Sequence, residues 1–141
     1  MNTHILIIDD DDIDARSIRR AFKKAGFSAP FLRAHDGEEA LALLRGEDGH
    51  SAPPTRVMVL LDINMPRMDG LEFLGEVRAD IRLRQLPIFV LTTSDDDRDI
   101  NGAYNAHVAG YLVKQRIGAA FEHLPELIAP YMNFVTFPDI R

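Results

Sequence analysis

The sequence has no cysteine, no long hydrophobic run and no excess of positive charge, and each absence excludes a class of protein. Without cysteine, neither a disulfide framework nor a thiolate metal site can form. The longest apolar runs, such as residues 57–61, are far shorter than the roughly 20 residues of a membrane-spanning helix. A net charge of -6 disfavours nucleic acid and anionic membrane surfaces as partners. We therefore expect a chain that neither spans a membrane nor binds nucleic acid.

The length and the N-terminus set further limits. At 141 residues, of which 46% are hydrophobic, the chain fits one compact globular domain. We expect any output module to lie in another chain. The first four residues run directly into a short apolar stretch that ends in four aspartates, which is unlike a signal peptide. We therefore expect a cytoplasmic protein.

Five apolar segments alternate with five segments of helical spacing. The apolar runs lack alternation, which is typical of strands buried on both faces of a parallel sheet. The predicted strands cover residues 4–8, 31–34, 57–61, 87–91 and 110–113. The predicted helices cover residues 13–25, 38–45, 71–79, 98–106 and 119–131. Because parallel neighbours need crossover connections, the alternation predicts a doubly wound five-stranded parallel sheet of order 2-1-3-4-5, with helices on both faces.

Two further segments connect or follow these elements. Residues 46–55 carry two glycines and a proline pair, which predicts an exposed loop and a candidate partner contact. We expect one domain over residues 1–132 and a C-terminal tail over residues 133–141. The tail holds Phe134, Val135 and Phe137, which would have to fold back or bury in a symmetric dimer. We favour the dimer.

The polar residues that follow the predicted strands point to phosphoryl transfer. They lie at the carboxyl ends, where an open α/β sheet forms its ligand crevice, and they are Asp9, Asp10, Asp62, Thr92 and Lys114. Crowded carboxylates repel one another unless a cation neutralises them, and Mg²⁺ prefers such oxygen ligands. Lysine supplies a charge for a phosphoryl oxygen, threonine supplies a donor, and an aspartate can be the nucleophile. Asp62 is the best-placed nucleophile.

Four stretches resemble the receiver domains of bacterial response regulators. They are residues 7–10, 61–70, 91–94 and 110–114, and the second contains Asp-x-x-Met-Pro-x-Met-Asp-Gly. The resemblance covers essentially the whole chain in order. It implies a flavodoxin-like, three-layer receiver fold and a phosphorylation-controlled switch.

Position by position, the resemblance also implies a role for each site residue. Asp62 matches the phosphoacceptor, and Asp9, Asp10 and the backbone carbonyl of Asn64 complete a Mg²⁺ site with it. Thr92 matches the hydroxyl that moves toward the phosphoryl group, and Lys114 matches the cation that contacts it. Tyr111 matches the aromatic side chain that turns inward on activation, although it could also be an ordinary half-buried strand aromatic.

A finer resemblance concerns the stand-alone regulators that serve bacterial phytochromes. The acidic opening over residues 9–14, the loop over residues 46–55 and the apolar tail are similar to theirs. This resemblance implies a sensor histidine kinase as phosphodonor, fused to a photoreceptor. It also implies a homodimer through the last two helices, the fifth strand and the tail.

One position departs from the receiver pattern. Receiver domains usually follow the lysine with a proline, commonly cis, whereas Gln115 follows Lys114 in this chain. A cis peptide before a residue other than proline costs about 2.5 to 4 kcal/mol. We therefore predict a trans peptide there, and the position of Lys114 stays open.

Several polar residues near the predicted site have simpler explanations. Asp11, Asp12, Asp14 and residues 95–97 lie at predicted helix starts, where capping and the helix dipole favour carboxylates. Thr93 is a small polar residue of a kind common at strand ends. The five histidines lack the spacing of a transition-metal site, so we expect surface or packing roles for them.

Three functions fit these residues. In the leading hypothesis, phosphorylation of Asp62 draws Thr92 and Tyr111 inward and remodels the face of the last two helices and the fifth strand. A second possibility is an interaction scaffold that binds its partner in either phosphorylation state. A third is a Mg²⁺-dependent phosphatase with its nucleophile on the first strand, within residues 9–11. The motif after the third strand favours the switch.

Overall fold

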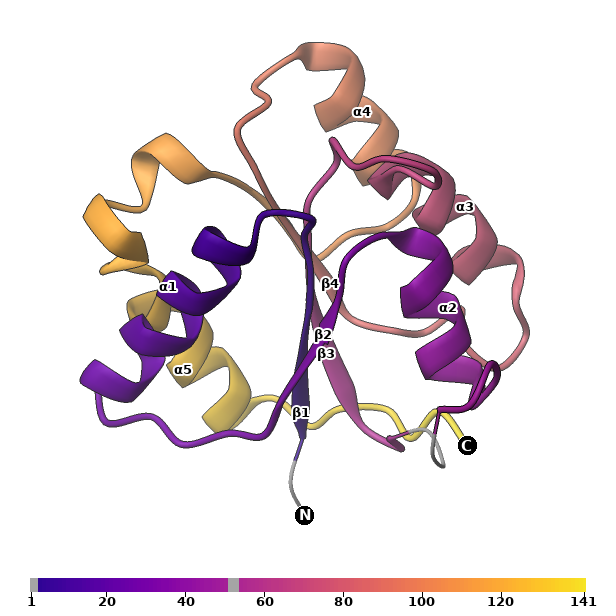
Figure 1. Ribbon diagram of the computed structural model, residues 1–141, viewed down its shortest axis with the longest axis horizontal. Coiled ribbons are helices and arrows are strands. Elements are labelled where there is room, and N and C mark those ends of the chain that lie inside the picture. Colours follow the sequence, from indigo (N-terminus) through magenta and orange to yellow (C-terminus); the bar gives the residue numbers. More distant parts are fainter. Residues whose placement is uncertain (1–2, 51–53) are drawn as a thin grey trace.

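The protein, described by a computed structural model over residues 3–50 and 54–141, is a three-layer α/β fold (Figure 1). Residues 51–53 of the predicted loop lie outside the described part. The strands are β1 (His4–Ile8), β2 (Phe31–Ala34), β3 (Val57–Leu61), β4 (Ile88–Thr92) and β5 (Gly110–Val113). They form one parallel sheet in the order β2-β1-β3-β4-β5, which confirms the predicted topology.

Helices cover both faces of this sheet (Figure 1). They are α1 (Asp12–Lys24), α2 (Gly37–Arg45), α3 (Gly70–Ala79), α4 (Asp97–Asn105) and α5 (Leu124–Phe134). Helices α1 and α5 contact each other on one face, whereas α2, α3 and α4 follow one another on the other. None of the helices within the described ranges has the length and apolar character that a bilayer crossing requires.

Successive strand residues point to opposite faces and divide the core into two clusters. On β1, Ile5 and Ile7 belong to the cluster under α1 and α5, which we call the α1/α5 cluster. Leu6 and Ile8 belong to the cluster under α2, α3 and α4, which we call the α2/α3 cluster. All four side chains are at most 1% exposed. The unbroken apolar runs of the sequence therefore reflect strands buried on both faces.

The prediction of a single helix over residues 119–131 is wrong at its start. Two 3₁₀ turns, η1 (Lys114–Arg116) and η2 (Ala119–Phe121), precede α5. Ala120 and Phe121 have φ values of 51° and 59°, and a right-handed helix cannot run through left-handed residues. Phe121 is buried in the α1/α5 cluster, so packing of this side chain stabilises the irregular path. Pro125 then lies in the first turn of α5, where a missing N–H is tolerated.

The C-terminal tail folds back onto the amino-terminal edge of the sheet. Phe137 is 5% exposed and packs in the α1/α5 cluster, and Ile140 is 2% exposed and packs in the α2/α3 cluster. The Ile140 N–H donates to the Thr55 carbonyl at 2.8 Å. Phe134 and Val135 remain exposed, and α5 continues to Phe134, past the predicted start of the tail at residue 133. Phe137 therefore takes the fold-back alternative and is no exposed dimer residue.

Candidate functional site

Three carboxylates meet at the carboxyl end of the sheet. In the β1–β3 register Ile8 lies opposite Leu61, so the next residues, Asp9 and Asp62, are neighbours. Asp10 joins them, and one ligand oxygen from each of the three carboxylates lies within 4.8 Å of the others. Asp9 and Asp62 are buried, whereas Asp10 is exposed. The structure thus brings together the three acidic residues that the sequence singled out.

The carboxylate of Asp9 is buried without full compensation of its charge. Its Oδ1 accepts the Asp11 backbone N–H at 2.9 Å, and its Oδ2 accepts the Lys114 ammonium at 2.8 Å. Burial nevertheless outweighs these contacts and raises the pKa of Asp9 to about 6. A cation beside Asp9, Asp10 and Asp62 would relieve this cost, and oxygen ligands suit a hard divalent ion. The residues present therefore fit a divalent metal site.

The two carboxylate oxygens of Asp62 have different surroundings. Oδ1 accepts the Thr92 hydroxyl at 2.7 Å and the Asn64 backbone N–H at 3.3 Å. Oδ2 has only the Lys114 ammonium, at 3.5 Å, among the contacts of the described residues. Hydrogen bonds thus fix one oxygen and leave the other with its lone pairs largely free.

The ammonium of Lys114 reaches the site although Gln115 follows it. The peptide between the two residues is trans, as predicted, and η1 begins at Lys114. The side chain of Lys114 is 9% exposed, and its Nζ lies 2.8 Å from both Asp9 Oδ2 and Asp14 Oδ2. Burial lowers the pKa of Lys114, but the bonds to Asp14 and Asp9 outweigh it and raise the pKa above its usual value. Lys114 is therefore a buried ammonium inside a carboxylate cluster.

Two contributors to the site were not predicted. Asp14, interpreted from sequence as a helix-start carboxylate, is one of the two close partners of Lys114. Arg33 donates from Nε and Nη2 to the backbone carbonyl of Asp9, at 3.0 and 2.6 Å, and pairs with Asp12 at 3.0 Å. It thereby holds the peptide that links Asp9 to Asp10. The only sequence signal for Arg33 was a cation within a short, otherwise apolar strand.

The predicted switch residues are linked through Ser94. The Ser94 N–H donates to Thr92 Oγ1 at 3.4 Å, and the Ser94 carbonyl accepts the Tyr111 hydroxyl at 2.9 Å. Tyr111 is partly buried against the α2/α3 cluster, and this burial raises the pKa of its hydroxyl. Thr93, which follows Thr92, is exposed. One loop residue therefore contacts both Thr92 and Tyr111.

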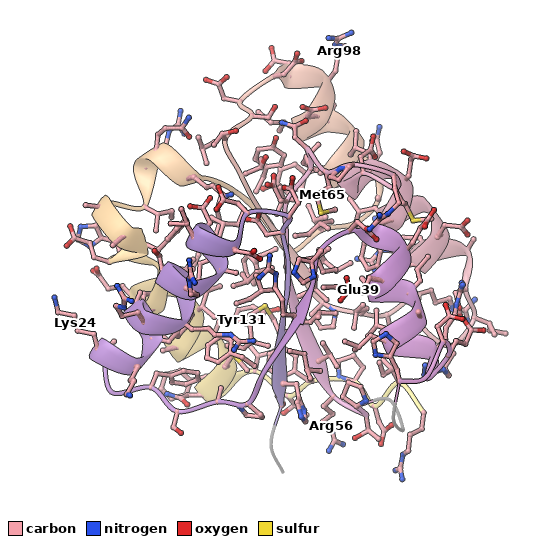
Figure 2. The ribbon with its side chains drawn as sticks, in the orientation of Figure 1. Lys24, Glu39, Arg56, Met65, Arg98 and Tyr131 are labelled. Carbon is pink, nitrogen blue, oxygen red and sulfur yellow. The ribbon has the colours of Figure 1, made fainter. Side chains whose placement is uncertain are left out.

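An ion pair and a hydrogen bond hold the loop that carries Asn64 against the start of α2. Arg67, with φ at 61°, forms an ion pair with the buried Asp36, and the Gly37 N–H donates to the Met68 carbonyl at 3.1 Å. Burial opposes ionisation of Asp36, but the Glu39 N–H and Arg67 outweigh it and lower the pKa. Figure 2 shows Met65, from the same loop, at the carboxyl end of the sheet. These contacts fix the backbone that follows Asp62.

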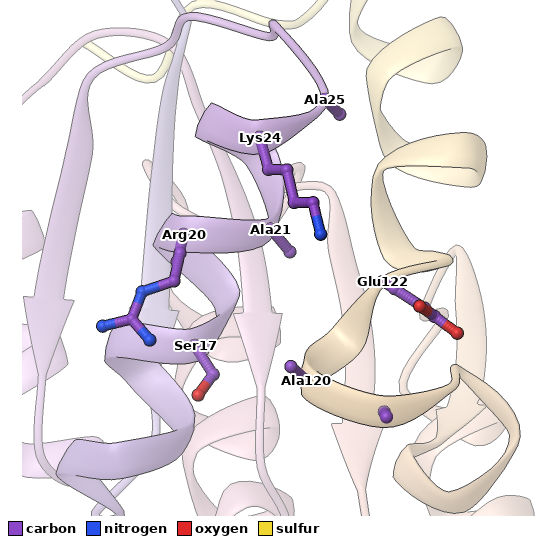
Figure 3. A pocket seen from close by; sticks show the side chains of 8 residues that line it. Ser17, Arg20, Ala21, Lys24, Ala25, Ala120 and Glu122 are labelled. Atoms are coloured by element: carbon purple, nitrogen blue, oxygen red, sulfur yellow. The ribbon is translucent and has the colours of Figure 1, made fainter.

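A separate groove of about 470 Å³ lies between α1 and η2 (Figure 3). Alanines form much of its lining, and Arg20, Lys24 and Glu122 add charge. None of the predicted site residues lines this groove. The predicted site residues therefore lie apart from this groove, at the carboxyl end of the sheet.

Comparison with known proteins identifies the family of this chain. The family model described as "Response regulator receiver domain" matches residues 5–124. The chain belongs to this family. The response regulator Rcp1 of Synechocystis sp. is 30% identical over 135 residues, which cover 95% of this chain and 92% of Rcp1. The probable methanogenesis regulatory protein FilR2 of Methanothrix harundinacea is 42% identical over 110 residues, which cover 78% of this chain and 70% of FilR2.

Two solved structures extend the likeness to stand-alone regulators. The Mn²⁺-bound form of response regulator Rcp1 superposes with a TM-score of 0.84 at 30% identity, covering 96% of this receiver and 99% of that chain. The phosphorylated cyanobacterial phytochrome response regulator RcpA superposes with a TM-score of 0.81 at 28% identity. The match covers 98% of this receiver and 99% of the RcpA chain. This receiver therefore shares its fold over nearly its full length with phytochrome response regulators.

Proposed function

We propose that this response regulator accepts a phosphoryl group on Asp62 from a sensor histidine kinase. The observation that carries the proposal is the asymmetry of the Asp62 carboxylate. Thr92 and Asn64 bind Oδ1, whereas Oδ2 is left free to attack. Oδ2 forms a bond to phosphorus while the bond from phosphorus to the donor imidazole nitrogen breaks, and the imidazole leaves with that electron pair. Lys114 and Thr92 stabilise the negative charge on the phosphoryl oxygens.

We propose Mg²⁺ as the metal, held by Asp9, Asp10, Asp62 and the backbone carbonyl of Asn64. The close approach of the three carboxylates and the burial of Asp9 support this set. The Mn²⁺-bound structure of Rcp1 supports a divalent ion in such a fold. When bound, the ion would offset the charge that gathers on the transferring group. Arg33, and the contacts between the Asn64 loop and the start of α2, hold the ligands in place before any ion binds.

We propose that the phosphoryl group acts on the rest of the protein through Thr92 and Tyr111. A shift of Thr92 toward the phosphoryl group would lengthen its 3.4 Å bond from the Ser94 N–H. Because Ser94 also holds the Tyr111 hydroxyl, the same shift would release Tyr111 to turn inward. The protein is in this view a switch and catalyses only its own phosphorylation and dephosphorylation.

We propose a homodimer through α4, β5, α5 and the tail as the readout of the switch. Leu127 and Phe134 are seven residues apart and share one face of α5, with 44% and 86% exposure. Residues 1–132 would then carry the phosphorylation site, and Phe134 and Val135 of the tail would supply part of the contact. The likeness to RcpA supports a kinase of the phytochrome type as donor.

Incubation with acetyl phosphate and Mg²⁺ is expected to add one phosphoryl group to the wild-type protein and none to Asp62→Asn. An amide has no nucleophilic oxygen anion, so the variant cannot form the acyl phosphate. Intact-mass spectrometry gives the readout, and excess EDTA should abolish the gain. A mass gain in Asp62→Asn would contradict the assignment. Sustained turnover of p-nitrophenyl phosphate would favour a phosphatase, and equal dimer affinity in both phosphorylation states would favour a scaffold.

Asp10→Asn is expected to weaken Mg²⁺ binding by about tenfold or more, because it removes one of three clustered anionic ligands. Isothermal titration calorimetry measures the affinity directly. Asp11→Asn removes the same charge from an exposed neighbour and keeps an oxygen that can cap α1, so it serves as the matched control. An equal loss of affinity in both variants would show that only net charge matters, and Asp10 would then be no ligand.

A further inference from the structure

The ammonium of Lys114 is shared unequally among three carboxylates. Its Nζ lies 2.8 Å from Asp9, 2.8 Å from Asp14 and 3.5 Å from Asp62. An ammonium has three N–H donors, and the two short bonds hold it on the side of Asp9 and Asp14. Lys114 therefore sits beside the proposed nucleophile without binding it closely.

The carboxylate of Asp14 is not needed for the start of α1. The side chain of Asp11 caps this helix and accepts the backbone N–H groups of Ile13 and Asp14, at 2.9 and 3.0 Å. Within the described part of the chain, the Asp14 carboxylate has its one hydrogen bond from Lys114. The local role that the sequence suggested for Asp14 is thus filled by Asp11, and the Asp14 side chain serves Lys114.

We propose that Asp14 is a positioning residue that holds Lys114 back from Asp62 before phosphorylation and competes with the phosphoryl group for the same ammonium afterwards. This inference rests on the proposed function of Asp62. By drawing Nζ to its own side, Asp14 keeps Oδ2 free of a close ammonium, and it also holds Lys114 away from the phosphoryl oxygens whose charge Lys114 stabilises.

The competition after phosphorylation follows from the same distances. A phosphoryl group on Oδ2 places several anionic oxygens where Lys114 is already only 3.5 Å away. Asp14 is 28% exposed, so water can solvate its carboxylate when the ammonium leaves. The more tightly Asp14 binds Lys114, the weaker the contact between Lys114 and the phosphoryl group becomes. Asp14 therefore shortens the lifetime of the phosphorylated state.

The test measures the phosphoryl lifetime of Asp14→Asn at saturating Mg²⁺, after phosphorylation by acetyl phosphate. We expect the lifetime to lengthen by about fivefold, the scale of a partly solvated charge-assisted hydrogen bond. Asp14→Glu keeps the carboxylate and should restore the lifetime toward the wild type. Asp11→Asn removes an adjacent charge without touching Lys114, and it should leave the lifetime unchanged.

The control variant makes the test decisive. Asp11→Asn removes the same charge one turn away, so an effect of net charge alone would appear in both variants. A lifetime that does not lengthen in Asp14→Asn, an equal lengthening in Asp11→Asn, or failure of Asp14→Glu to restore the lifetime would each overturn the role of Asp14. Absence of Asp62 phosphorylation in the wild type would instead refute the proposed function itself.

Discussion

Gly70→Ala is expected to destabilise the fold by about 2 to 3 kcal/mol, because no side chain fits between the start of α3 and the end of β3. A Cβ at Gly70 would lie 2.4 Å from the Asp62 carbonyl oxygen and 2.8 Å from the Ile63 Cα. Both are backbone atoms, so neither can move aside as a flexible side chain could. The displaced backbone is that of Asp62 itself, and we therefore expect weaker Mg²⁺ binding as well.

Gly75 provides the matched control within the same helix. Apart from its two chain neighbours and the backbone of its own helix, a Cβ at Gly75 would meet no atom of the described residues within 4 Å. Gly75→Ala should stabilise the protein by about 0.5 to 1 kcal/mol, since alanine is the better helix former. Urea unfolding and calorimetric Mg²⁺ titration of both variants supply the comparison. Wild-type stability in Gly70→Ala would show that the backbone at Asp62 yields more easily than its packing suggests.

Phe137→Ala is expected to lower the free energy of unfolding by about 3 kcal/mol, the usual cost of emptying a buried aromatic site. Phe137 packs against Tyr131 with ring centroids 5.7 Å apart, and Tyr131 in turn packs against Phe89 of β4 at 5.0 Å. Loss of the ring would leave a cavity beside the sheet. Urea unfolding at a protein concentration that keeps the oligomeric state constant measures the effect.

Phe134→Ala tests the proposed dimer contact of the tail separately from the packing of Phe137. Because Phe134 is 86% exposed, its truncation should change monomer stability by less than about 0.5 kcal/mol. Sedimentation equilibrium should nevertheless show weaker self-association if Phe134 lies in the proposed dimer contact. Unchanged self-association in Phe134→Ala, or a monomeric wild type in both phosphorylation states, would contradict that dimer.

The strands and the site residues that follow them were predictable because each depends on local sequence. Continuous apolar runs mark strands buried on both faces, and the polar residues at their carboxyl ends must meet at one edge. The start of α5 was not predictable in this way. Residues 119–123 have no local signal against a helix, and the left-handed path at Ala120 and Phe121 depends on packing in the α1/α5 cluster.

The role of Asp14 was missed, and that of Phe137 was left open, because contacts between distant segments decide both. Asp14 has a complete local explanation at a helix start, and its partner Lys114 lies 100 positions further along the chain. Phe137 lies in an apolar tail that the sequence predicts to fold back or to dimerise, and only the folded sheet edge decides between these two.

The folded-back tail also affects how the protein unfolds. Phe137 lies in the α1/α5 cluster and Ile140 in the α2/α3 cluster, so four consecutive residues join the two sides of the sheet. Arg82 of the segment after α3 donates to the Ile140 carbonyl at 3.0 Å, and Arg56 donates to the Phe137 carbonyl at 3.2 Å. Detachment of either helical layer would therefore break contacts of the tail as well. The two layers therefore belong to one cooperative unfolding unit, although the sheet separates their cores.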